Sequence, residues 1–150
     1  MSKKYIKLSP SDFKSGEINL PGSKSISNRV LLLSALSKGK TNIKNLLFSD
    51  DTNIMISALK KLGISISEKD EFNNCLVQGS ENLFPNKNAD LFIDNAGTAI
   101  RPLTAALAFN NGEYKLHGSK RMHERPIKDL VDSLLSMGGK IDYLEKYGYP

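Results

Sequence analysis

The feature that most constrains the fold of this chain is a match between its two halves. When the sequence is shifted against itself by 75 residues, glycines and hydrophobic residues of the second half fall on counterparts in the first. The matched pairs are Ile18 with Ile93, Gly22 with Gly97, Ser23 with Thr98, Leu59 with Leu134, Leu62 with Met137, Gly63 with Gly138 and Ile66 with Ile141. A gap of two residues also aligns Gly39 with Gly112. Because these positions mark strand ends and helix ends in the same order, the chain is predicted to contain two copies of one structural unit.

Hydrophobic periodicity predicts the elements of the first copy. Residues 16–20 indicate a short strand that ends at Pro21-Gly22, and Ser23 is expected to cap a helix over residues 25–36. Gly39 ends this helix. The expected elements that follow are a strand at 41–47, a helix at 52–62 opened by Ser49-Asp50-Asp51 and ended by Gly63, and strands at 64–68 and 74–78. Residues 16–80 are therefore predicted to form a β-α-β-α-β-β unit.

The second copy is predicted over residues 88–150. Its expected elements are a strand at 89–93, a helix at 98–109, a strand at 114–117, a helix at 126–137 with Pro126 in its first turn, and a strand at 140–144. The first copy suggests one more strand than the second provides, so the second unit is predicted to stop before its last strand. The fold class is α/β, or α+β, with repeated units, and residues 1–15 are predicted to be a separate N-terminal segment.

Composition narrows the classes of partner. The net charge of +5 and the pI of about 9.3 favour acidic ligands. The lysines are scattered and aromatic residues make up only 7%, so nucleic acid is not expected as a partner. No run of 18 apolar residues and no secretory signal pattern is present, so we expect no membrane partner and a cytoplasmic location.

The single cysteine of the chain does not indicate a disulfide or a metal site. Cys75 has no second cysteine to pair with and no histidine or cysteine at ligand spacing. It is expected to be a small buried strand residue, and no metal site is predicted.

The segment L-P-G-S-K-S-I-S-N-R, residues 20–29, has the pattern of an anion site. A glycine turn stands directly before a helix whose first turns carry Lys24, Ser25 and Arg29. Unpaired backbone N–H groups and the positive end of the helix dipole favour phosphate or carboxylate, and the two cations add full charges. A capped helix with two solvated cations is the alternative that this spacing alone leaves open.

Two further segments repeat this chemistry. In D-N-A-G-T-A-I-R-P-L, residues 94–103, Gly97 lets a ligand approach the backbone closely, Asn95 or Thr98 is expected to cap the helix, and Arg101 lies one turn inside it. In K-R-M-H-E-R-P, residues 120–126, Arg125 precedes a proline, which favours an extended backbone that presents its guanidinium to an anion. A solvated loop, and an Arg101 paired with a neighbouring carboxylate, are the structural alternatives.

The first two of these segments and R-M-H-E-R-P-I-K-D-L-V-D at residues 121–132 resemble motifs of the 5-enolpyruvylshikimate-3-phosphate synthase family. S-D-D at residues 49–51 and I-D-Y-L-E at residues 141–145 stand in matching places. They stand in the family's order and at similar spacing, from about Gly16 to the C terminus. The family enzyme is much longer, so the resemblance implies an N-terminal fragment that is inactive alone. It also implies two domains of three β-α-β-α-β-β units each, with ligands in a cleft that helix N-termini face. Whether residues 1–15 pack on this part of the enzyme or on the second domain stays open.

The resemblance further implies a reaction and its residues. The 5-hydroxyl of shikimate 3-phosphate adds to phosphoenolpyruvate and phosphate leaves, a step toward chorismate and the aromatic amino acids. Lys24, as a catalytic residue, Gly97 and Arg125 match positions that contact phosphoenolpyruvate or the herbicide glyphosate, and Lys24, Ser25 and Arg29 match shikimate-phosphate contacts. No cofactor is implied. The expected partners are the two substrates and the rest of the enzyme, which is a monomer when complete.

Two other functions remain open at this point. The related UDP-N-acetylglucosamine enolpyruvyl transferase shares the chemistry, but the S-K-S-I-S-N-R turn argues against it, and Cys75 is in the wrong place for that enzyme's reactive cysteine. A non-catalytic phosphate-binding module is the second alternative. A P-loop is excluded, because G-x-x-x-x-G-K-[ST] is absent.

Overall fold

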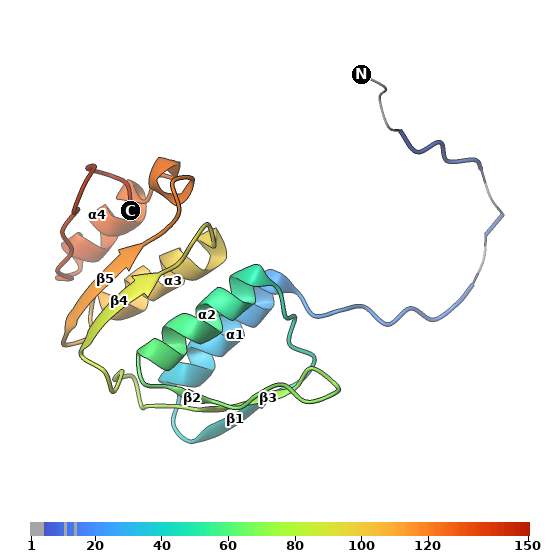
Figure 1. Ribbon diagram of the computed structural model, residues 1–150, viewed down its shortest axis with the longest axis horizontal. Helices are drawn as coiled ribbons and strands as arrows, with labels where there is room; N and C mark the ends of the chain where they lie inside the picture. Colours follow the sequence, from blue (N-terminus) through green and yellow to red (C-terminus); the bar gives the residue numbers. More distant parts are fainter. Residues whose placement is uncertain (1–4, 11, 14) are drawn as a thin grey trace.

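The computed structural model describes residues 5–10, 12, 13 and 15–150. Its body begins at Gly22 and Ser23, and the described residues before that point run as an extended segment away from it (Figure 1). The helices and strands form an α/β body in which helices lie between two small sheets (Figure 1). Residues 1–4, 11 and 14 of the predicted N-terminal segment lie outside the described residues.

The first half combines two helices with a three-stranded antiparallel sheet. In chain order the elements are α1 (Lys24–Leu36), β1 (Lys40–Ile43), α2 (Asp50–Lys61), β2 (Ser65–Ile66) and β3 (Cys75–Gln78). The strand order is β1-β3-β2, with Ile43 opposite Cys75 and Ser65 opposite Gln78. The predicted strands at 41–47, 64–68 and 74–78 are confirmed as shorter strands. The two predicted helices are confirmed with bounds shifted by one or two residues.

The second half is a parallel βαβ unit followed by a further helix. Its elements are β4 (Asn88–Phe92), α3 (Gly97–Leu107), β5 (Glu113–His117), the 3₁₀ turn η1 (Met122–Glu124) and α4 (Lys128–Ser136). β4 and β5 pair in parallel, as strands joined by a crossover helix do. The predicted helix at 126–137 begins later, because Pro126 precedes the N-cap residue Ile127.

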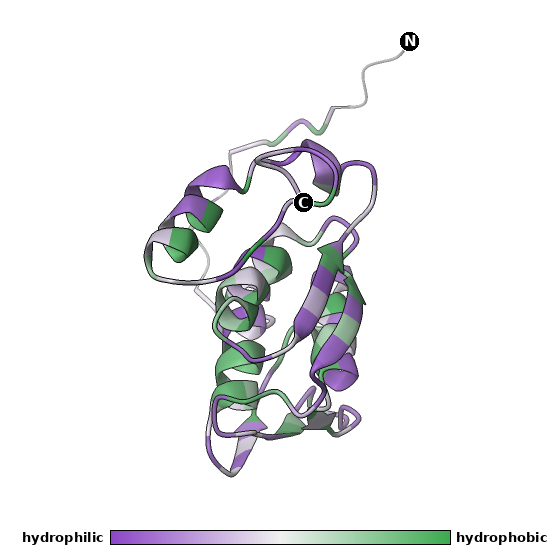
Figure 2. Ribbon diagram, turned by 90° about the vertical axis from the view of Figure 1, so that its left-hand side faces the viewer, coloured by the Kyte–Doolittle hydropathy of each residue, from purple (hydrophilic) through white to green (hydrophobic). Residues whose placement is uncertain are grey.

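One hydrophobic core joins the two halves. α1 contacts α2 and α3, α2 contacts α3, and the three helices share a continuous buried cluster with the strands. Leu31, Met55, Leu59, Leu91 and Leu103 are among its fully buried side chains. At the far end, α4 is amphipathic, and Figure 2 shows polar and apolar residues alternating along it. The two copies thus fold against each other, which fixes the positions of three helix N-termini.

Corresponding turns of the two copies have the same backbone geometry. Gly63 follows α2 and Gly138 follows α4, and both have φ of +91°. This left-handed conformation is the common way to end a helix and strongly favours glycine. The order helix, strand, helix also recurs in both halves, as the 75-residue match predicts.

Two predicted strands are absent from the described residues. Residues 16–20 form no strand, and Ile18 and Leu20 are 81% and 76% exposed. Residues 140–144 also form none. A strand requires a neighbour for its backbone N–H and C=O groups, and within residues 15–150 no strand edge pairs with either segment. The C-terminal residues are instead held at Gly148, whose carbonyl accepts a hydrogen bond from the Ile127 N–H.

Two smaller sequence expectations concern burial and membranes. Cys75 lies buried in β3, as predicted, and burial raises the pKa of its thiol. Among the described residues, none of the helices has the length and apolar character that crossing a bilayer requires.

Candidate anion-binding site

The N-termini of three helices meet through direct side-chain contacts. Lys24 in the first turn of α1 places its Nζ 3.2 Å from Oδ2 of Asp51, in the first turn of α2. The hydroxyl of Thr98, at the start of α3, donates to the same Oδ2 at 3.1 Å. Each N-terminus carries the partial positive charge of its helix, and the Lys24 ammonium adds a full charge that Asp51 offsets in part. This is the arrangement expected of a site for anionic ligands.

Local sequence explains why α1 and α2 begin where they do. The Ser49 N–H donates to the Thr52 hydroxyl at 2.8 Å, so a threonine takes the part that glutamate or glutamine usually has in a capping box. Gly22 allows the chain before α1 to lie against residues 45–47, because a Cβ there would stand 2.3 Å from the Asn45 carbonyl oxygen. The Ser27 hydroxyl accepts from the Leu47 N–H at 3.1 Å. The turn before α1 and the loop before α2 are thus packed together.

Asn28 connects α1 to α3 inside the body. Its side chain is fully buried, and its Nδ2 donates to the Thr98 hydroxyl at 2.8 Å. Asn28 stands four residues after Lys24 and so on the same face of α1. The contacts therefore run from Asn28 through Thr98 and Asp51 back to Lys24.

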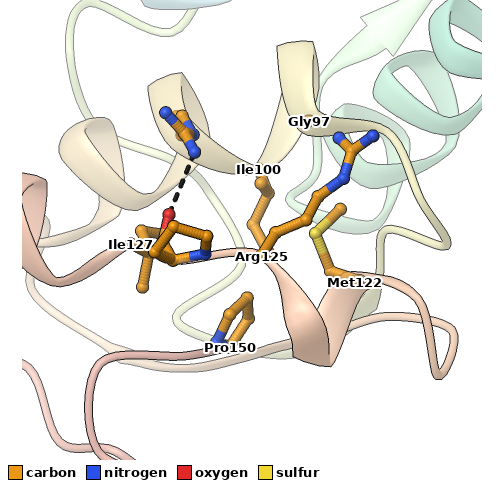
Figure 3. A pocket seen from close by; sticks show the side chains of 8 residues that line it. Gly97, Ile100, Met122, Arg125, Ile127 and Pro150 are labelled. Carbon is orange, nitrogen blue, oxygen red and sulfur yellow. Dashed lines mark hydrogen bonds between the residues drawn. The ribbon is translucent and has the colours of Figure 1, made fainter.

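Gly97 and Arg125 form a second part of the site. The Arg125 side chain extends over the start of α3, so that a Cβ on Gly97 would stand 2.3 Å from its Nη1 (Figure 3). The cavity next to them encloses only about 10 Å³, and it is lined by Gly97, Ile100, Arg101, Met122, Arg125, Pro126, Ile127 and Pro150. Gly97 therefore makes room for a guanidinium in this structure, where the sequence predicted room for a ligand.

Arg101 has a supporting role in holding this loop. Its Nη2 donates to the Pro126 carbonyl at 2.9 Å (Figure 3). Its partner is thus a backbone carbonyl and not the neighbouring carboxylate that was the structural alternative. This bond fixes α3 to the residue directly after Arg125.

The other predicted residues have fewer contacts. Ser23 occupies the N-cap position of α1, as predicted, but its side chain makes no capping hydrogen bond. Ser25 is half-buried and Arg29 is exposed on the same face of α1, and neither side chain bonds to another described residue. Neither Asn95 nor Thr98 caps α3. Its N-cap is Ala96, and the Thr98 hydroxyl is bonded to Asp51 and Asn28 instead.

Sequence reasoning missed two residues of this cluster. Asp51 was predicted only as part of a helix cap, and Asn28 was given no role. A signal for Asp51 was available, because a carboxylate at a predicted anion site repels the anion unless a cation beside it offsets its charge. Asn28 is separated from Thr98 by 70 residues, so only the packing of α1 on α3 shows this contact.

The backbone before α3 is unusual for a residue with a side chain. Asp94 has φ of +44°, in the left-handed region, and its carbonyl accepts from the Ser119 N–H at 3.0 Å. Aspartate tolerates this conformation better than most residues. The sharp turn carries the chain from β4 into α3 and brings Gly97 beside the loop that holds Arg125.

The larger hollow of the body lies beside this cluster. It measures about 370 Å³, and its lining is Gly22, Ser23, Ile26, Ser27 and Val30 together with residues 41–46. Lys24, Asp51 and Thr98 do not line it. The meeting point of the helix N-termini is therefore an open surface, on which the side chain of Lys24 is 48% exposed and that of Asp51 is 25% exposed. Within residues 5–10, 12, 13 and 15–150, no group of three or more His, Cys, Asp or Glu side chains is placed to hold a metal ion.

Comparison with known proteins gives the family. The family model for EPSP synthase (3-phosphoshikimate 1-carboxyvinyltransferase) matches residues 9–150. The 3-phosphoshikimate 1-carboxyvinyltransferase of Paraburkholderia phytofirmans is 58% identical over 146 residues, and that of Burkholderia cenocepacia is 57% identical over 146. Both alignments cover 97% of this chain and 33% of the relative. The chain thus spans about a third of the length of the curated relatives that it matches.

Solved structures agree with this assignment. Two structures of EPSP synthase from Acinetobacter baumannii superpose on the chain with a TM-score of 0.80 and 26% sequence identity. Each superposition covers 90% of this chain, and they cover 30% and 31% of the respective structures. With most of its length matched by sequence and by structure, this chain belongs to the EPSP synthase family.

Proposed function

We propose that this chain supplies part of the active site for transfer of the enolpyruvyl group of phosphoenolpyruvate to the 5-hydroxyl of shikimate 3-phosphate, with release of phosphate. The observation that carries this proposal is the meeting of three helix N-termini at Lys24, Asp51 and Thr98, beside the Gly97–Arg125 contact. The names of the relatives support the reaction, since each is a 3-phosphoshikimate 1-carboxyvinyltransferase.

The charges of the two substrates explain why such a site is needed. Each substrate carries both a phosphate ester and a carboxylate, so the two repel each other when they are held side by side. Cations and helix N-termini that converge on one place offset this repulsion. Lys24 has the central part in the proposal, because it lies where α1 and α2 begin and its ammonium can face an anion on its exposed side.

The other residues have separate parts in the proposal. Ser25 and Arg29 on α1 bind the phosphate of shikimate 3-phosphate, and Gly97 and Arg125 flank the position of phosphoenolpyruvate. Arg101 holds the Arg125 loop through Pro126. Glyphosate, as an anion that takes the place of phosphoenolpyruvate, is proposed to contact Lys24, Gly97 and Arg125.

Proton transfer is not assigned to any residue of this chain. The relatives extend over about three times the aligned length, and we propose that the acid and base of the reaction belong to the remaining two-thirds of the whole enzyme. The chain alone is then expected to bind a substrate weakly without turnover.

A comparison of ligands tests the proposed substrate. Shikimate 3-phosphate, UDP-N-acetylglucosamine and ATP are titrated separately into the 150-residue chain by calorimetry. The proposal predicts saturable heat with shikimate 3-phosphate only, and no phosphate release when phosphoenolpyruvate is added. Binding of UDP-N-acetylglucosamine alone would support the related transferase, and equal binding of all three would reduce the site to a non-selective phosphate-binding surface.

A further inference from the structure

We propose that Asp51, Thr98 and Asn28 are positioning residues that hold the Lys24 ammonium in place through a network of two hydrogen bonds and one ion pair across three helices. This network begins at Asn28 on α1, passes through Thr98 on α3 and Asp51 on α2, and returns to Lys24 on α1. The inference rests on the proposed function only in so far as Lys24 contacts an anionic substrate.

Hydrogen-bond chemistry fixes which group donates and which accepts in the two hydrogen bonds of this network. A threonine hydroxyl has one proton to donate, and a carboxylate only accepts. The Thr98 hydroxyl therefore donates to Asp51 Oδ2 at 3.1 Å, and it accepts from the Asn28 amide at 2.8 Å. The amide of Asn28 is oriented accordingly, because only its Nδ2 can donate. A substitution that removes the Thr98 proton leaves the carboxylate without this bond.

Two contacts to one carboxylate oxygen explain how Thr98 can restrict the position of the Lys24 side chain. Oδ2 of Asp51 accepts from the Thr98 hydroxyl and lies 3.2 Å from the Lys24 Nζ. A lysine side chain has four flexible bonds and a rotamer entropy of about 2 kcal/mol, so it takes a defined position only when its ammonium has a fixed partner. The Thr98 hydroxyl limits rotation of the carboxylate, and the carboxylate then limits the lysine.

Along this network, the burial of the side chains decreases from the interior of the protein to its surface. Asn28 is fully buried, Asp51 is 25% exposed and Lys24 is 48% exposed. The inner end is therefore rigid, while the outer end faces solvent where a ligand arrives. This gradient is what a positioning role requires. A contact that only holds helices together needs no exposed lysine at its end.

The first experiment follows Lys24 directly, without any ligand. Lysines of the 150-residue chain are reductively ¹³C-methylated, which keeps their charge, and their NMR signals are assigned by single Lys→Arg variants. Thr98→Val is expected to move and sharpen the Lys24 signal toward that of a freely rotating lysine, and Thr98→Ser is expected to restore it. Lys38, which pairs with Glu81 beyond the end of α1, is the control that should not change.

A second variant covers the case in which Thr98→Val does not fold. Asp51→Asn keeps an oxygen for Thr98 but removes the charge that attracts the ammonium, and it is expected to release the Lys24 signal with little loss of helical circular dichroism. An unchanged Lys24 signal in folded Thr98→Val or in Asp51→Asn would overturn the inference.

A double-mutant cycle then separates this inference from the proposed function. Thr98→Val is expected to weaken shikimate 3-phosphate binding by about two- to tenfold in the natural chain and to have no effect in a Lys24→Met background. An equal loss in both backgrounds would show that Thr98 acts independently of Lys24, and the inference would fail. If Lys24→Met itself left binding unchanged, the proposed function would fail, while the NMR result would still decide the inference.

Discussion

At the scale of single residues, the neighbour of Gly97 determines what this glycine does. The sequence suggested that a ligand approaches its backbone, but the Arg125 guanidinium occupies that side, 2.3 Å from where a Cβ would be. The contact is with the end of a flexible side chain, so an added methyl group displaces the guanidinium rather than the backbone. The space at Gly97 therefore sets the position of Arg125.

Gly97→Ala is predicted to move Arg125 and to weaken phosphoenolpyruvate binding without unfolding the chain. The midpoint of thermal unfolding should stay close to that of the natural protein, as in the control Gly16→Ala, where a Cβ meets nothing within 4 Å. Calorimetry should show that Arg125→Ala adds little further loss in the Gly97→Ala background, because both changes remove the same contact. Fully additive losses would contradict this account.

The residue scale also shows what a local sequence pattern can and cannot indicate. Lys24 was predicted from its place beside a glycine turn, and the structure places it in the cluster of helix N-termini. Thr98 was predicted as a cap, yet its hydroxyl bonds to groups on two other helices. A local pattern indicates which residues can bond, whereas the partner is decided by how helices pack.

At the scale of elements, the start of α1 depends on a close backbone contact. A Cβ at Gly22 would stand 2.3 Å from the Asn45 oxygen and 2.8 Å from the Leu47 nitrogen, both in the backbone. Gly22→Ala is therefore predicted to lower the free energy of unfolding by about 1–3 kcal/mol, the usual cost of overpacking. Urea denaturation measures this loss. Gly16→Ala is the control, and an equal effect of the two substitutions would rule out the steric explanation.

The turn between β2 and β3 is predicted to weaken in acid. The backbone N–H of Asn74 is the main cause that holds the pKa of Asp70 below its usual range, and the Asn74 amide and the Phe72 N–H also donate to this carboxylate. A carboxyl group with a lowered pKa in the folded state stabilises the fold above its unfolded-state pKa, near 4, and this contribution is lost as the pH falls through the folded-state value.

Thermal unfolding at several pH values tests this turn. Asp70→Ala should unfold at a lower temperature than the natural chain at pH 7, and the difference should shrink as the pH falls below about 4. Glu71→Ala removes an adjacent exposed carboxylate and should have little effect at any pH. A difference for Asp70→Ala that is constant from pH 7 to pH 2 would show that its hydrogen bonds do not depend on the charge.

Helices were easier to predict than strands for a physical reason. The periodicity of α1, α2 and α3 is contained in each segment, and their ends are marked by residues such as Gly39 and Gly63. A strand also needs a partner edge. Residues 16–20 and 140–144 have the alternation of strands without a paired neighbour in the described chain, so their prediction was wrong here.

At the scale of the whole molecule, the repeat explains why helix N-termini converge. The helices that open the two copies, α1 and α3, contact each other, and α2 packs against both. Gly22 stands just before the first turn of α1, and Gly97 is the first residue of α3. Two copies of a glycine turn followed by a helix thus bring their positive ends together. The unit boundaries at residues 16–80 and 88–150 stay predictions, and whether residues 1–15 pack on a second domain stays open.

The central claim is that the helix N-termini around Lys24 bind an anionic substrate. Two lysines at opposite ends of α1 test this claim most directly. Lys24 lies in the first turn of α1, and Lys38 lies just beyond its C-terminal end, where it pairs with exposed Glu81. Either Lys→Ala substitution removes the same charge from the protein. Calorimetric titration of the 150-residue chain with shikimate 3-phosphate compares them.

The account predicts that Lys24→Ala weakens this binding by about tenfold or more, the effect of losing one charge-assisted contact, while Lys38→Ala leaves it nearly unchanged. Circular dichroism should show both variants folded. Equal losses of affinity in the two variants would mean that only net charge matters, and would contradict a site at the N-terminus of α1.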